Sequence, residues 1–100
     1  MRVTLSRAAL RDLEKARDHL LEAAGLSVAL RFLDSIEDVH IQLSEFPMSG
    51  ASWDFVGPGI RRWTVKGFSY GLFYRFDGER VLILRILHSA RDIPATLRDG

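Results

Sequence analysis

The carboxy-terminal third of the chain constrains the fold most strongly, because it has the pattern of three successive strands. Its apolar-rich runs, separated by turn-forming residues, lie at 60–65, 70–76 and 80–88. Apolar and polar residues alternate along 60–65, as in a strand that buries one face, and 70–76 is rich in aromatic residues. Asp77-Gly78 is a strong hairpin signal, since glycine accepts the positive φ that such turns require. Residues 66–69 should form the preceding turn, so we predict three antiparallel strands.

The last of these strands, at 80–88, is apolar on both faces, and such a strand usually lies inside its sheet. Strict alternation places four residues on each face. One set is Val81, Ile83, Arg85 and Leu87, and the other is Leu82, Leu84, Ile86 and His88. Arg85 then stands in an otherwise apolar row. An ion pair explains this arginine as well as a functional site does.

Two amphipathic helices are predicted before the strands, because apolar residues recur there at three- and four-residue steps. The first apolar stripe consists of Ala9, Leu13, Ala16, Leu20 and Ala24, and the second of Ala29, Phe32, Leu33, Ile36, Val39, Leu43 and Phe46. Gly25 ends the first helix, Ser27 is a candidate cap for the second, and Pro47 stops it. The short link at Gly25-Leu26 predicts an antiparallel hairpin that covers a sheet.

The solvent face of the first helix is expected to carry mixed charges, namely those of Arg7, Arg11, Asp12, Glu14, Lys15, Asp18 and Glu22. His19 lies beside the apolar stripe. No second histidine and no cysteine stands three or four residues further along the helix. We therefore interpret His19 as a boundary residue of the helix rather than as a metal ligand.

The remaining segments complete an α+β fold. Residues 2–5 alternate as a short strand does, and Ser6 is suited to cap the first helix. Glycine and proline punctuate a loop at 47–59, from which we expect Trp53 and Phe55 to fold back onto the core. Asp92 is placed to cap a short last helix. We predict one domain over residues 1–100, with the order β-α-α-β-β-β, an antiparallel sheet covered on one face by a helical hairpin, and a short C-terminal helix.

Composition excludes several classes of protein and site. The chain has no cysteine, so it has neither a disulfide framework nor a thiolate metal site. No apolar run approaches the roughly 20 residues of a membrane span, and the amino-terminal residues lack the apolar core of a secretory signal. Cytoplasmic residence without membrane contact is the expectation.

Charge is divided unevenly along the chain. Residues 1–50 have six Lys and Arg against eight Asp and Glu, whereas residues 51–100 have eight Lys and Arg against five Asp and Glu. The basic half favours an acidic partner, although a solvated sheet face would have the same composition.

Functional candidates concentrate on the predicted strands. No paired carboxylates and no zinc-ligand spacing occur, and no cofactor motif is present. The candidate cluster consists of Arg62, Lys66, Tyr74, Arg85, His88 and Arg91. Arginine and lysine can stabilise a developing phosphorane, and histidine or tyrosine can transfer protons, so the cluster has the chemistry for RNA cleavage. The same residues equally suit a surface that binds an acidic partner without catalysis.

The order of the elements and several segments resemble the RelE/ParE superfamily of toxins from bacterial type II toxin–antitoxin systems. The segments are SRAALRDLEKARDHL, LSEFPMSG, IRRWTVKGFSYGLFYRFDGERVLILRILH and the closing HSARD. Together they cover nearly the whole chain. The stretch FYRFDGERVLILRILHSARD is most similar to the ParE branch, whose members commonly end the last strand with histidine, one or two small residues and Arg-Asp.

The resemblance implies a toxin that is neutralised by a cognate antitoxin, whose disordered tail folds onto it through helix-in-groove and strand-addition contacts. ParE-type members poison DNA gyrase and cause growth arrest without chemistry of their own. RelE-type members cut messenger RNA on the ribosome. As a nuclease, this chain would depend on His88, Arg85, Arg62 and Lys66. Gly71 stands where RelE-type chains usually have arginine, and no tyrosine follows His88, so the ParE-type function is favoured. Direct contact with nucleic acid is left open.

Overall fold

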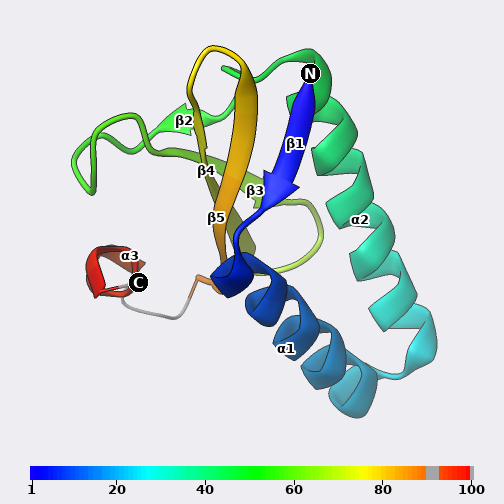
Figure 1. Cartoon of the computed structure of the whole chain (residues 1–100). Coiled ribbons are helices and arrows are strands. Elements are labelled where there is room, and N and C mark those ends of the chain that lie inside the picture. The colour runs from blue at the N-terminus through cyan, green and yellow to red at the C-terminus, as the bar shows by residue number, and fades with distance from the viewer. Residues whose placement is uncertain (90–92, 100) are drawn as a thin grey trace.

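A five-stranded sheet lies between a helical hairpin and a short third helix in the computed structural model, which describes residues 1–89 and 93–99 (Figure 1). The elements are β1 (Arg2–Leu5), α1 (Arg7–Ala24), α2 (Leu26–Glu45), β2 (Ala51–Ser52), β3 (Arg61–Val65), β4 (Tyr70–Phe76), β5 (Arg80–His88) and α3 (Ile93–Asp99). The strand order is β1-β5-β4-β3-β2. This arrangement confirms the predicted α+β class and the order of its helices and strands.

The antiparallel unit β3-β4-β5 forms as predicted, with turns at 66–69 and 77–80. Asp77 stabilises the second turn, because its Oδ1 accepts hydrogen bonds from the backbone N–H groups of Glu79 and Arg80, both at 2.9 Å. The sheet is larger than the predicted unit. β1 pairs with β5 in parallel, and the two-residue strand β2 pairs with β3 inside the segment that was expected to be a loop.

The helical hairpin forms because Gly25 alone links α1 to α2. Its φ of 92° lies in the left-handed region, which glycine adopts without steric cost. The expected cap at Ser27 is wrong, since α2 already begins at Leu26. The expected cap at Ser6 is confirmed, because its hydroxyl accepts a hydrogen bond from the Ala9 N–H at 3.0 Å.

The main core lies between the hairpin and the sheet. Its buried residues include Phe32, Ile36 and Leu43 of α2 together with Leu72, Tyr74, Val81 and Ile83 of the strands. Both predicted apolar stripes form this interface, but their ends do not. Ala24 is exposed, and Phe46 is 58% exposed because α2 stops at Glu45.

A β-bulge in β5 changes which residues face the helices. Tyr74 pairs with Ile83 and Phe73 with Arg85, so Leu84 has no partner on β4. Beyond this point Ile86, rather than Leu87, belongs to the main core. The predicted face of Val81, Ile83, Arg85 and Leu87 is therefore wrong after Ile83, because a bulge shifts the alternation by one residue.

A second, smaller core covers the opposite face of the sheet, where α3 lies (Figure 1). Ile60, Phe73, Leu87 and Ile93 form it, and Trp53, Leu84 and Leu97 pack against it. The prediction for the 47–59 loop is therefore half correct. Trp53 folds back, but Phe55 is 76% exposed although its ring centroid lies 4.9 Å from that of Trp53.

Candidate functional site

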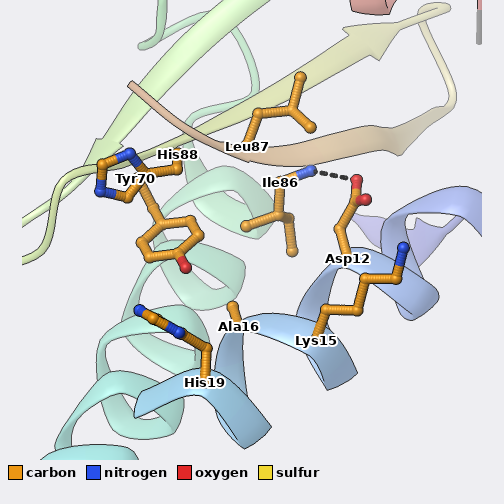
Figure 2. A pocket seen from close by; sticks show the side chains of 8 residues that line it. All are labelled: Asp12, Lys15, Ala16, His19, Tyr70, Ile86, Leu87 and His88. Atoms are coloured by element: carbon orange, nitrogen blue, oxygen red, sulfur yellow. Dashed lines mark hydrogen bonds between the residues drawn. The ribbon is translucent and has the colours of Figure 1, made fainter. Parts of the chain in front are cut away.

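A pocket of about 360 Å³ lies between the middle of α1, the start of β4 and the end of β5 (Figure 2). From α1 it is lined by Asp12, Lys15, Ala16 and His19, whose spacing places them on one side of a helix. From the sheet it is lined by Tyr70, Ile86, Leu87 and His88. The pocket thus brings together two histidines, a tyrosine, a lysine and an aspartate from segments that are distant in sequence.

Asp12 anchors α1 to the edge of β5 with three hydrogen bonds. Its Oδ2 accepts from Arg85 Nε at 2.7 Å and from the Ile86 backbone N–H at 3.0 Å, while its Oδ1 accepts from the Arg85 NH2 group at 3.0 Å. β1 ends opposite Ile83, so it offers no hydrogen-bond partner to Ile86. Asp12 therefore provides the acceptor that a neighbouring strand would otherwise offer to the Ile86 N–H, in addition to pairing with Arg85.

The expectation that Asp12 lies on the solvent face of α1 is wrong. Its side chain is only 10% exposed, and that of Arg85 is 16% exposed. An arginine that is largely withdrawn from water in an apolar row requires a partner, and the bidentate carboxylate provides it. The hydrogen bonds that Arg85 donates to Asp12 raise the pKa of Arg85 above its ordinary value. Arg85 thus has a structural ion pair, which was one of the two explanations that the sequence left open.

His88 lies at the exposed end of β5 and contacts Tyr70, its partner in the strand pairing. The two rings meet edge to face, with centroids 5.2 Å apart and an interplanar angle of 89°. Figure 2 shows Tyr70 extending from the strand toward His19 of α1. Histidine and tyrosine side chains can donate and accept protons, so this end of the pocket has the groups for acid–base chemistry.

The other candidate residues do not join this pocket. Arg62 packs on the opposite face of the sheet, where its guanidinium carbon lies 5.4 Å from the Trp53 ring centroid and 5.8 Å from that of Phe73. A Cβ atom at position 71 would lie 2.6 Å from Arg62 Nε, so Gly71 leaves the space that this arginine occupies. Lys66 is exposed in the β3–β4 turn and lines separate pockets beside α2.

Tyr74 has no exposed surface, so it contacts no partner in this conformation. Its hydroxyl accepts a hydrogen bond from the Gly50 N–H at 2.8 Å, and burial raises its pKa. We assign it a structural function in place of the target contact expected from the sequence. Arg91, the last candidate, lies outside the described residues.

Lys15 and Asp12 were not predicted as residues of a pocket, and His19 was interpreted as a boundary residue of the helix. The spacing of 12, 15, 16 and 19 along one helical side was a signal that could have grouped them. Within residues 1–89 and 93–99, no group of three potential metal ligands occurs. None of the helices in that part of the chain has the length and apolarity needed to cross a bilayer.

The family model described as the ParE toxin of the type II toxin–antitoxin system parDE matches residues 3–93. The chain belongs to the ParE toxin family. It is 36% identical over 96 residues to Toxin ParE3 of Caulobacter vibrioides, which covers 96% of this chain and 94% of that relative. It is also 30% identical over 97 residues to Toxin ParE1 of Mycobacterium tuberculosis, with 96% and 97% covered. This chain is therefore a ParE-type toxin of a type II system, as the sequence predicted.

The fold of this ParE family member is also similar to the folds of solved structures. A chain from the chromosomal ParDE toxin–antitoxin system of P. aeruginosa superposes with a TM-score of 0.76 at 27% identity, covering 88% of this chain and 95% of that one. A YoeB/ParE toxin from Agrobacterium tumefaciens gives a TM-score of 0.60 at 14% identity, covering 88% and 98%. The second match shows a shared fold alone.

Proposed function

We propose that this ParE-type toxin arrests growth by poisoning DNA gyrase in the cytoplasm, and that a cognate antitoxin neutralises it by binding. The observation that carries the proposal is the family match over residues 3–93. The relatives named as ParE toxins span nearly the whole chain, and the similar P. aeruginosa chain comes from a ParDE system. The proposed mechanism is binding without chemistry by the toxin itself.

The positions of the basic residues support binding over catalysis. A nuclease site needs a cation beside the scissile phosphate and a proton-transfer group within reach of the same atoms. Arg85 already shares a bidentate pair with Asp12, and Arg62 stacks on aromatic rings on the other face of the sheet. Of the four residues required for the nuclease alternative, only His88 lines the pocket.

One observation favours the alternative of a ribosome-dependent endoribonuclease. His88, Tyr70 and His19 line the same pocket, and Lys15 adds a positive charge to its wall. These groups provide a proton donor, a proton acceptor and a cation within one cavity. The alternative therefore rests on the pocket residues rather than on the arginines of the strands.

Replacing His88 by asparagine separates the two functions. Asparagine retains hydrogen-bonding capacity, but it cannot take up and release a proton near neutral pH. We expect His88→Asn to arrest growth within about threefold of the wild-type dose, because a toxin that acts by binding alone needs no proton transfer. In a nuclease, loss of a general acid or base would instead cost about 10²–10⁴ in rate. His40→Asn, which changes an exposed histidine of α2, is the matched control. Growth curves at graded induction measure the dose.

Complete loss of growth arrest by a folded His88→Asn chain, with wild-type arrest by His40→Asn, would contradict the proposal. The nuclease function would then be supported if messenger RNA fragments disappeared together with the arrest. Thermal melts of both variants check that the fold is intact.

A further inference from the structure

A second pocket, of about 370 Å³, lies between the amino terminus of α1, the strands and α3. Its apolar wall comes from Ile60, Leu84 and Leu97, and its polar wall includes Arg7, Arg75 and Arg85. The pocket combines an apolar surface with three guanidinium groups. Such a combination suits a negatively charged group that is attached to an apolar body.

The three arginines differ in how much charge they can offer to a ligand. Asp12 neutralises Arg85 through the bidentate pair. Arg7 and Arg75 have no carboxylate within salt-bridge distance in the described part of the chain. The pocket therefore has two positive charges that no carboxylate of the described residues neutralises.

The side chain of Arg75 is held by the loop that precedes β3. Its Nε donates a hydrogen bond to the Pro58 carbonyl at 3.0 Å, which directs the guanidinium along the loop that precedes β3. A Cβ atom at position 57 would lie 3.3 Å from the NH2 group of Arg75, so Gly57 allows this close packing. Among the described residues, none accepts a hydrogen bond from the terminal nitrogens of Arg75, which leaves them available as donors.

The amino terminus of α1 adds to the positive potential beside Arg7. No acidic residue occurs in the first turn of this 18-residue helix, where a carboxylate would normally be favoured. The Ser6 hydroxyl accepts a hydrogen bond from the Ala9 N–H, but not from the N–H groups of Arg7 and Ala8. Residues 6–8 all line the pocket. The helix terminus and the two arginines thus favour the same kind of ligand, a carboxylate or another oxyanion.

We propose that this pocket binds an acidic side chain carried on an apolar segment of the antitoxin; this inference rests on the proposed neutralisation by an antitoxin. The apolar wall can pack against the apolar side chains that flank a carboxylate in a protein segment. A nucleic-acid phosphodiester has no such apolar neighbours, so the wall favours the protein segment. The net charge of +1 and a cavity of side-chain size also argue against a track for a nucleic-acid backbone. Charge complementarity thus selects an acidic protein segment.

The test is the dissociation constant of the complex between the full chain and its co-expressed antitoxin, measured for Arg7→Glu and for Arg7→Glu with Arg75→Glu. We expect affinity to fall about tenfold or more in the double variant, since each reversal replaces a charge-assisted hydrogen bond by repulsion. Arg11→Glu, one turn further along the exposed side of α1, is the control and should change affinity less than twofold. Arg7→Glu places an acid in the first helical turn, where it stabilises the helix, so weaker binding would not reflect unfolding.

Four outcomes separate the ideas under test. Wild-type affinity in the double variant would overturn the pocket proposal and leave the proposed function intact. Equal weakening by Arg11→Glu would also overturn it, because the effect would then be one of general charge. Failure of the wild-type chain to bind the antitoxin would overturn the neutralisation proposal and this inference with it. Restored affinity in the double variant, when one antitoxin Asp or Glu is replaced by lysine, would identify the ligand of the pocket.

Discussion

Replacing Ile36 by aspartate is expected to lower the free energy of unfolding by about 5 kcal/mol or more, which is at least a third of the about 5–15 kcal/mol of a small domain. Ile36 is 9% exposed and belongs to the main core between α2 and the sheet. A carboxylate there would be removed from water and surrounded by the apolar side chains of that core. Urea denaturation followed by circular dichroism measures the loss.

Ile41→Asp is a matched control, because it makes the same substitution five residues further along the same helix. Ile41 is 51% exposed, so the new carboxylate stays in water and the free energy of unfolding should change by less than about 1 kcal/mol. If Ile36→Asp melted like Ile41→Asp, the placement of α2 on the sheet would be wrong.

Replacing Asp12 by alanine is expected to destabilise the domain by about 3–5 kcal/mol, because it leaves the mostly buried charge of Arg85 without a partner. The same change removes the acceptor of the Ile86 N–H at the edge of β5. Hydrogen exchange at Ile86 should therefore accelerate together with the drop in the urea midpoint. Both effects are local consequences of losing one carboxylate.

Two comparisons separate the charge of Asp12 from its shape. Asp12→Asn can still accept the hydrogen bond from Ile86, so its destabilisation should be smaller than that of the alanine variant. Glu14→Ala removes an exposed acid from the same helix and should change stability by less than about 0.5 kcal/mol. An equal effect of all three substitutions would show that the pair with Arg85 contributes nothing specific.

Local pattern was sufficient to predict most of the elements of the fold. Helical periodicity identified the stripe from Phe32 to Leu43, and Asp77-Gly78 identified the β4–β5 turn, because both signals act between neighbours in sequence. The parallel pairing of β1 with β5 has no local signal, since it depends on contacts between residues about 78 positions apart. The bulge at Leu84 likewise has no local signal, although it changes the face of every later residue in β5.

The candidate site was predicted less well than the fold. Arg85 was recognised as anomalous in an apolar row, but its partner Asp12 was assigned to solvent. Helical periodicity shows only which residues share a side of the helix, and it cannot show that a backbone N–H of β5 needs an acceptor there. Tyr74 and Arg62 were grouped with His88 by residue type alone. Their side chains are instead used within the molecule, Tyr74 by Gly50 and Arg62 by the Trp53 and Phe73 rings.

The proposed poisoning of DNA gyrase by this ParE-type toxin can be tested by incubating the antitoxin-free chain with gyrase, ATP and relaxed plasmid. We expect supercoiling to be lost and linear DNA to appear after detergent and protease treatment, because a trapped gyrase holds cleaved DNA. Prior addition of the antitoxin should restore supercoiling. Undisturbed supercoiling with a folded chain, as verified by its thermal melt, would contradict the claim and make the His88 pocket a candidate ribonuclease site.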